Sequence, residues 1–455
     1  METKETKQLK KEINLLGGIS LLTGIMVGSG IFFIGSYVLI RTNFSLGLAL
    51  LVWVIGGIIT LFSGLVYAEL GTSLPFTGGY YVYLKEAYGK PVAFMSGFTN
   101  FILASSGSIA ALSLAFGLIL ANVIFTMTGT WISSPIQKLI AALVIILLSI
   151  LNLMGIKFGN IVQKSFLFIK AVPIFLVLSL GLILGTQRVD LSLNLGDVSI
   201  WNILSTLGFA VIATFWAYEG WTNLNNVAEE MKNPARDLPR SLIITILSVT
   251  ALYTLYNFSI YRVISIPDMQ AMIAAGDVFL GITSAFLILG SFGMYLVMLT
   301  MLISVFGAIN GCIIAFPRVY FAMGKDGTFF KSFSKIHPKT NVPYVAIIAS
   351  SIVAIILLIF SLDELVTFVV FGGLIFNALI FASVFIFRKR YPNLDRPYKV
   401  WGYPFVPIIN ILVMIGLLFA TLRESWLQAV IGLIIIMSGL PIYYILQKYE
   451  KLKNL

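Results

Sequence analysis

Apolar runs of about 20 residues, the length that crosses a hydrocarbon core as a helix, recur along the whole chain with short polar connections between them. The pattern predicts an all-α polytopic membrane protein with twelve transmembrane helices in a single transmembrane domain, residues 1–455. We place these helices at 14–40, 45–70, 91–123, 137–156, 161–185, 201–228, 240–263, 282–323, 342–361, 364–387, 405–422 and 426–446.

Two of the predicted helices are interrupted by residues that a membrane helix usually avoids. The first contains GIMVGSGIF, and the sixth contains FWAYEGWTN from Phe215 to Asn223. A glycine in a helix interior is unfavourable by roughly 1 kcal/mol, and unwound backbone at membrane depth needs surrounding protein or a water-filled cavity. Interrupted helices at matching places in two halves indicate a substrate site between inverted repeats, here five helices apart. Close packing of helices at the glycines is the alternative.

The first interruption has the features of an anion receptor. A half-helix that begins after Gly28 would leave several backbone N–H groups without partners, and the helix dipole would make that end positive. The N–H groups concerned are those of Ser29, Gly30 and Ile31.

Carbonyl groups at both interruptions would accept hydrogen bonds from an ammonium group. They belong to Met26 in the first helix and to Phe215, Trp216 and Glu219 in the sixth. A zwitterionic α-amino acid fits both sets of groups. Trp216 and Tyr218 flank the second interruption and are large enough to cover a bound solute; ordinary aromatic packing is the alternative for both.

Ionisable residues inside the bilayer are unfavourable, so each is a functional hypothesis. Lys170 lies within FLFIKAVPIF of the fifth predicted helix. Its ammonium could replace a coupling cation and bridge carbonyls of the first helix to a hydroxyl such as Ser304; extension to the cytoplasmic surface is the alternative. Glu219 could carry a proton, pair with Lys170 or select substrates, and Glu69 is expected to cap or pair locally.

Charge and composition narrow the function further. Charged residues make up 11% of the chain, hydrophobic residues 59%, and the net charge is +11. With a cytoplasmic N-terminus, 24 of the 30 Lys and Arg fall in cytoplasmic segments, so the charge indicates topology rather than nucleic-acid binding. We therefore expect a multi-pass protein of the cell membrane, in contact with the lipid bilayer, with both termini cytoplasmic. One cysteine, Cys312, and one histidine, His337, leave no basis for a metal site, a cofactor or an enzyme.

Five ordered segments resemble one transporter family. They are GSGIF from Gly28, AELGTSLPFTGGYYVYLKEAYG from Ala68, GIKFGNIVQKSFLFIK ending at Lys170, EEMKNPARDLPRSL from Glu229 and SVFGAINGCIIAFPRVYFAMGKDG from Ser304. Over nearly its whole length the chain resembles the amino acid–polyamine–organocation (APC) transporters, in particular the L-type amino acid transporter (LAT) branch. Within that branch it resembles bacterial serine/threonine or alanine/serine/cysteine exchangers.

The resemblance implies a LeuT-like fold: a five-plus-five inverted repeat, residues 1–185 and 201–387, with helices 1 and 6 unwound, plus two additional helices in 405–447. It implies that Ser29, Gly30 and Ile31 bind the substrate carboxylate. Carbonyls of Met26, Trp216 and Glu219 would bind the amine, Trp216 would gate the site, and Lys170 with Ser304 would couple bundle to scaffold.

The implied function is sodium-independent exchange of small neutral L-amino acids (alanine, serine, threonine, cysteine) by alternating access. Proton-coupled symport and transport of cationic amino acids or polyamines are the alternatives, because Glu219 stands where many relatives have Gly or Asp. The loop from Phe125 to Gln137 contains no cysteine, so no disulfide-linked heavy subunit is expected. The oligomeric state stays open.

Overall fold

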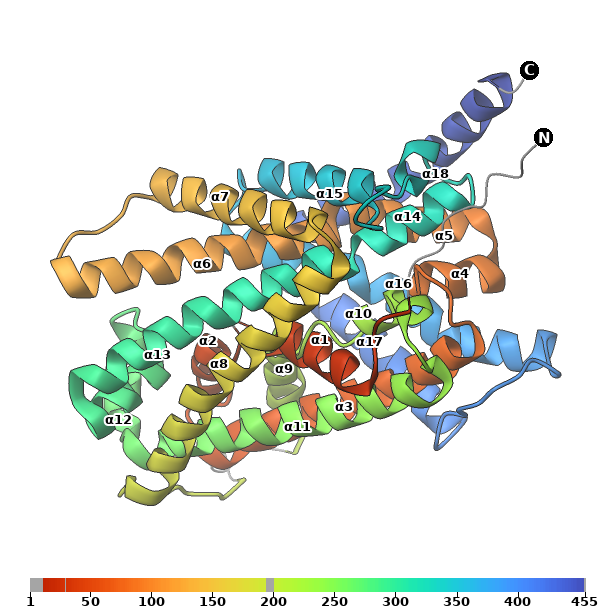
Figure 1. Cartoon of the computed structure of the whole chain (residues 1–455). Helices are drawn as coiled ribbons and strands as arrows, with labels where there is room; N and C mark the ends of the chain where they lie inside the picture. The colour runs from red at the N-terminus through yellow and green to blue at the C-terminus, as the bar shows by residue number, and fades with distance from the viewer. Residues whose placement is uncertain (1–10, 29, 194–199, 454–455) are drawn as a thin grey trace.

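The computed structural model describes residues 11–28, 30–193 and 200–453, and within them the chain folds into helices with no β-strand (Figure 1). The α-helices of the first half are α1 (Leu15–Met26), α2 (Gly30–Arg41), α3 (Leu46–Ser73), α4 (Tyr80–Tyr88), α5 (Lys90–Thr99), α6 (Ser105–Thr128), α7 (Ser134–Leu153), α8 (Ile156–Leu184), α9 (Ile200–Tyr218) and α10 (Asn223–Asn226). Those of the second half are α11 (Pro234–Val263), α12 (Ile266–Ala274), α13 (Leu280–Ala315), α14 (Pro317–Lys325), α15 (Tyr344–Leu357), α16 (Leu362–Arg390), α17 (Phe405–Glu424) and α18 (Trp426–Lys453). Three short turns complete the set: a π-helical turn, η1 (Asn100–Ala104), and the 3₁₀ turns η2 (Ala228–Glu230) and η3 (Lys331–Ser334).

Eight helical segments of the described residues are long and apolar enough to cross a membrane. They are Leu46–Ser73, Lys90–Thr128, Ser134–Leu153, Pro234–Val263, Leu280–Lys325, Leu362–Arg390, Phe405–Arg423 and Trp426–Lys448. The pair α1 and α2, bent by 49° at their junction, passes the same test as one broken span. The prediction of an all-α, multi-pass membrane protein is therefore confirmed.

The two interrupted helices lie among the longer ones. In Figure 1, α1, α9 and α10 lie in the interior of the bundle, and α6 and α7 run beside α15. The helix α3 packs along α11, and α8 packs along α13. α1 contacts α8, α11 and α13, while α2 contacts α9. Non-helical backbone at this depth is thus surrounded by protein, as it must be in a membrane.

Small residues allow α3 and α11 to approach closely. A Cβ atom added at Gly57 would lie 2.2 Å from the Thr250 hydroxyl oxygen and 2.3 Å from its methyl carbon, so no rotation of the threonine makes room. Small residues at helix interfaces let backbones approach, and this approach drives helix association in lipid.

Some boundaries differ from the sequence-based prediction. The helices α4 and α12 were not predicted, because both are nine-residue segments, too short to be recognised as spans. The predicted span 282–323 is divided into α13 and α14 at Pro317, which occupies the first turn of α14. The predicted span 91–123 contains the π-helical turn η1.

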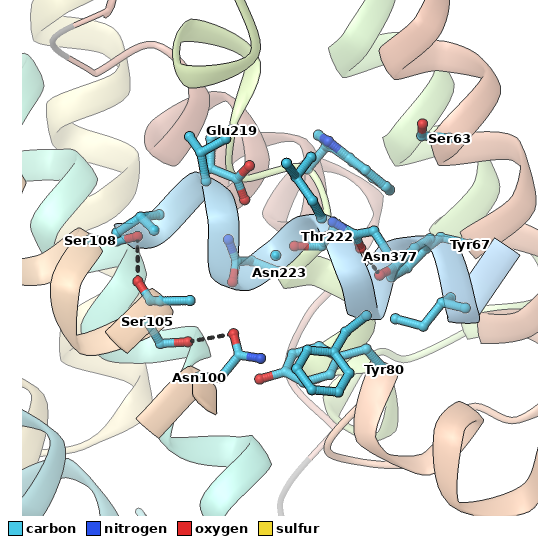
Figure 2. A pocket seen from close by; sticks show the side chains of 18 of the residues that line it. Ser63, Tyr67, Tyr80, Asn100, Ser105, Ser108, Glu219, Thr222, Asn223 and Asn377 are labelled. Carbon is cyan, nitrogen blue, oxygen red and sulfur yellow. Dashed lines mark hydrogen bonds between the residues drawn. The ribbon is translucent and has the colours of Figure 1, made fainter. Parts of the chain in front are cut away.

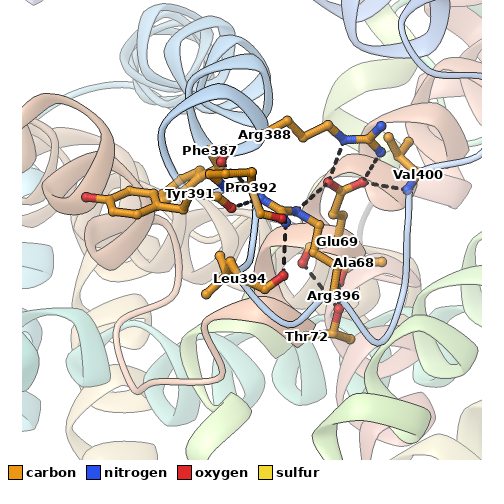
Figure 3. A network of polar contacts seen from close by, with 10 residues as sticks. All are labelled: Ala68, Glu69, Thr72, Phe387, Arg388, Tyr391, Pro392, Leu394, Arg396 and Val400. Atoms are coloured by element: carbon orange, nitrogen blue, oxygen red, sulfur yellow. Dashed lines mark hydrogen bonds and ion pairs between the residues drawn. The ribbon is translucent and has the colours of Figure 1, made fainter.

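Glu69 is the clearest correction, since its partners are distant in the sequence (Figure 3). Its buried carboxylate accepts hydrogen bonds from Arg388 Nε at 3.0 Å and Nη2 at 2.7 Å, and from the Val400 backbone N–H at 2.6 Å. Arg396 lies 3.7 Å away and donates to carbonyls at the end of α16. A buried carboxylate must be paired, so this Glu69 cluster ties α3 to the connection between α16 and α17.

We predict that Gly57→Ala lowers the free energy of unfolding by roughly 1–3 kcal/mol, because the added methyl group would push α3 away from α11. The measurement is the thermal unfolding midpoint of the purified protein in detergent. Gly416→Ala in α17 is the matched control, since no atom lies within 4 Å of its added Cβ. Equal midpoints for the two variants would disprove the close contact at Gly57.

Candidate functional site

The first interruption separates α1 from α2. α1 ends at Met26, Val27 and Gly28 are not helical, and α2 begins at Gly30. Ser29 lies outside the described residues. A Cβ atom at Gly30 would lie 2.6 Å from the Ala217 Cα atom, so this glycine brings the backbones of α2 and α9 together. The two interpretations of the first interruption, a helix break and close helix packing at a glycine, therefore both hold for this segment.

The second interruption follows α9. The helix ends at Tyr218, and residues 219–222 form a turn before the short helix α10. Gly220 has a φ of +115°, which side-chain-bearing residues rarely adopt, and a Cβ there would lie 2.5 Å from Ile25. The predicted breaks at Gly28 and Gly220 are thus both present, and they lie against each other.

Several carbonyls at the breaks have protein partners. Lys170 Nζ donates to the carbonyl oxygens of Val27 at 2.6 Å and Gly24 at 3.2 Å, and Ser304 Oγ donates to the same Val27 oxygen. Lys170 is only 1% exposed, so its ammonium lies at the break and does not extend to the membrane surface. The predicted contact of Lys170 and Ser304 with the first helix is observed; its coupling role stays a prediction.

Tyr253 of α11 joins the two breaks. Its hydroxyl lies 2.6 Å from the Met26 carbonyl oxygen and 2.9 Å from that of Ala217. The Met26 carbonyl oxygen also accepts from the Gly28 backbone N–H at 2.8 Å, so both of its lone pairs have protein donors. Nothing in the sequence distinguishes Tyr253 from the other tyrosines of the apolar helices, so sequence reasoning missed it.

A small hollow lies between the breaks; its cavity volume is about 30 Å³, within about 400 Å³ of space that includes open solvent. Of the predicted substrate-binding residues, Met26, Gly28, Gly30, Trp216 and Glu219 line this central hollow. Sequence reasoning named Gly220 and Asn223 only as part of the second interruption, and it missed the other lining residues: Ile25, Ser108, Leu112, Cys312 and Phe316.

Three predicted residues do not line the hollow. Ile31 is buried in α2. The Tyr218 hydroxyl donates to the Trp53 carbonyl at 2.8 Å, and its ring packs against Trp53 and Tyr253, as the packing alternative describes. Phe215 lines a neighbouring cavity instead.

Two larger cavities flank the central hollow. One, here called the amide cavity, is lined by Asn100, Asn223, Asn226 and Asn377 among others, and holds about 920 Å³ of free space, part of it open to solvent (Figure 2). The other, the Asp363 cavity, is named after a residue that lines it. It holds about 1340 Å³ of free space, part of it open to solvent, and lies beside α2 and α17. Glu219 lines the hollow and the amide cavity, whereas Trp216 lines the hollow and the Asp363 cavity.

Comparison with known families identifies the family of the chain. Residues 13–440 match the family model described as amino acid permease. The chain belongs to the amino acid permease family. This confirms the resemblance to the APC transporters and makes the chain a transporter rather than an enzyme.

Similar proteins of this family cover the chain almost completely. The chain is 36% identical over 447 residues to the serine/threonine exchanger SteT of Bacillus subtilis, covering 98% of each chain. It is 30% identical over 454 residues to the mouse b(0,+)-type amino acid transporter 1, covering 98% of this chain and 90% of that one. The human cystine/glutamate transporter is also 30% identical, over 98% of this chain and 87% of its own length.

We predict that Tyr253→Phe lowers the free energy of unfolding by roughly 1–3 kcal/mol, because it deprives carbonyls at both breaks of a donor. Thermal unfolding in detergent measures the change. Tyr256→Phe, one turn along the same helix, is the control, since the Tyr256 hydroxyl has no hydrogen-bond partner among the described residues and its loss should leave stability unchanged. If both variants unfold like the parent protein, Tyr253 does not hold the breaks together.

Proposed function

We propose that this amino acid permease is a sodium-independent exchanger of small neutral L-amino acids that works by alternating access. The observation that carries the proposal is the central hollow between two helix breaks, because residues at the end of α1, the start of α2 and the end of α9 line it together. The similarity to a serine/threonine exchanger supports small hydroxylated or aliphatic amino acids as substrates.

The bound amino acid would be held at both of its charged groups. Its carboxylate would accept hydrogen bonds from the N–H groups at the start of α2, at Ser29, Gly30 and Ile31, where the helix dipole is positive. Its ammonium would donate to carbonyls of the α9 break, at Trp216 and Glu219, and to that of Met26, where it would replace one of the two protein donors. Trp216 would then cover the bound solute on the side of the Asp363 cavity.

We extend the proposal to the number and order of spans. The broken helix α1 with α2, followed by α3, α5 with α6, α7 and α8, would form the first repeat, residues 1–185. The broken helix α9 with α10, followed by α11, α13, α15 and α16, would form the second, residues 201–387. With α17 and α18, in 405–447, this gives twelve spans, and each group of five begins with its broken helix.

The same proposal places the chain in the cell membrane with both termini in the cytoplasm. The excess of Lys and Arg in alternate connections supports this orientation. The end of α3, the helix α4 and the Glu69 cluster then lie at the cytoplasmic side, and the amide cavity lies between them and the central hollow. Because Cys312 is buried and is the chain's only cysteine, we propose no disulfide-linked partner subunit.

The position of Lys170 supports sodium independence. Its ammonium already supplies a positive charge to the carbonyls of Gly24 and Val27, together with the Ser304 hydroxyl. A sodium ion at these oxygens would lie beside a like charge, which is unfavourable in a low-dielectric interior.

Proton-coupled symport, or transport of a cationic amino acid or polyamine, is the second candidate because of Glu219. This carboxylate lines the central hollow and is exposed within the cavities, and no Lys or Arg is among the described residues that line the hollow. A substrate ammonium or a transported proton would meet this negative charge.

We predict that labelled L-serine enters proteoliposomes loaded with unlabelled L-serine in the absence of sodium. Proteoliposomes that contain no internal serine should take up much less label, because the return step of an exchanger needs internal substrate. Uptake into empty proteoliposomes that requires a pH gradient would reject exchange in favour of symport. Competition by alanine, threonine, lysine and putrescine separates the neutral from the cationic substrate class.

We predict that Lys170→Ala lowers the maximal exchange rate at least tenfold while the half-saturating serine concentration changes less. The reason is that Lys170 contacts the break through carbonyls of α1 from the neighbouring helix α8, outside the set of residues that line the hollow. Lys138→Ala is the control, since that lysine also donates to a carbonyl, that of Ile359, but is partly exposed and distant from the breaks in the sequence. A normal maximal rate in Lys170→Ala would remove this residue from the mechanism.

A further inference from the structure

The amide cavity contains buried polar groups that have no hydrogen-bond partner among the described residues. They are the Tyr80 hydroxyl, the Ser96 hydroxyl, the Asn223 amide oxygen, and both polar atoms of the Asn226 amide. Each of these side chains is at least nine-tenths buried, and they come from α4, α5 and α10. Buried polar groups are normally paired, so unpaired groups that converge on a cavity indicate a ligand or water that completes them.

Figure 2 shows how these groups converge. Asn223 extends downward from the turn that carries Glu219, and the Tyr80 ring and Asn100 approach from the opposite side of the cavity. The Asn100 amide is oriented by hydrogen bonds with the Ser96 carbonyl at 2.9 Å and the Ser105 hydroxyl at 3.4 Å. Donors and acceptors are therefore held on several walls rather than on one flexible side chain.

The charge of the cavity restricts its ligand. Glu219 is an exposed carboxylate at the junction with the central hollow, and no Lys, Arg or His is among the described residues that line the cavity. Such a lining favours a ligand with one ammonium group. The unpaired donors, the Tyr80 hydroxyl and the Asn226 amide nitrogen, can in addition satisfy a carboxylate at a distance from Glu219.

Aromatic rings close the cavity on its far side. Tyr67 contacts Trp221 with ring centroids 4.8 Å apart and Phe381 with centroids 6.1 Å apart, and all three residues line the cavity. The Tyr67 hydroxyl donates to the Asn377 amide oxygen at 2.6 Å, which joins α3 to α16. The cavity is thus a compartment of its own between these rings and the central hollow.

We propose that the amide cavity is a second binding site for a zwitterionic amino acid, occupied from the cytoplasmic side before the molecule reaches the central hollow. The ammonium binds Glu219, and the carboxylate accepts hydrogen bonds from Tyr80 and Asn226. This inference rests on the proposed exchange function, in which a cytoplasmic amino acid must enter for every external one released.

The variant that tests the site is Tyr80→Phe, which removes one hydroxyl and keeps the ring. Tyr256→Phe is the matched control, because its hydroxyl is also buried and unpartnered but does not line the amide cavity. Half-saturating concentrations of labelled L-serine are measured at each face, in right-side-out and inside-out vesicles. We expect Tyr80→Phe to raise the cytoplasmic value about tenfold, the loss of about 1.4 kcal/mol, and to leave the external value unchanged.

Equilibrium dialysis of L-serine against the purified protein in detergent gives a second readout. The parent protein and Tyr256→Phe should bind two molecules per chain, and Tyr80→Phe should lose the second within the same concentration range. Asn226→Leu, which removes both unpaired amide atoms, is the substitute if Tyr80→Phe does not fold, with the same expected result.

Three results would overturn the proposal. Unchanged values at both faces, with one serine bound by every variant, would show that water alone fills the cavity. An equal rise at both faces would place Tyr80 in the central site. Serine binding with a stoichiometry of one in the parent protein would refute the second site even where exchange is normal. Failure of the parent protein to exchange would instead refute the proposed function, and the dialysis would still decide the second site.

Discussion

The structure depends on how peptide groups that leave helical geometry are paired inside a membrane, where water cannot pair them. The first break is possible because Lys170 and Ser304 donate to the Val27 carbonyl and Tyr253 donates to that of Met26. These donors come from α8, α13 and α11. Three neighbouring helices are therefore fixed around α1 by the same hydrogen bonds that keep its backbone unwound.

The three cavities follow from this arrangement. α9 also breaks, with Trp216 in its last turn and Glu219 directly after its end. Each of the two residues borders the central hollow and one larger cavity. The aromatic residue separates the hollow from one cavity by its size, while the carboxylate lies at the junction with the other and acts through its charge.

Sequence reasoning predicted the places where the apolar pattern of a membrane helix is interrupted. Glycines and a carboxylate in otherwise apolar runs marked both breaks, and Lys170 stood out as a buried cation. It did not reveal Tyr253 or Ser108, because tyrosine and small polar residues are common in membrane helices and only packing decides which of them face a hollow. The partner of Glu69 was equally hidden, since Arg388 is 319 positions away. Boundaries within long apolar runs, such as the division at Pro317, depend on local backbone geometry that hydropathy does not register.

The contact between Gly30 and Ala217 restricts how the protein can diversify. Their backbones lie so close that any side chain at position 30 would force α2 and α9 apart and open the wall of the hollow. That wall is consequently fixed in shape. We therefore expect a different solute preference to arise through the opposite wall, where α6 contributes Ser108 and Leu112 and α13 contributes Cys312.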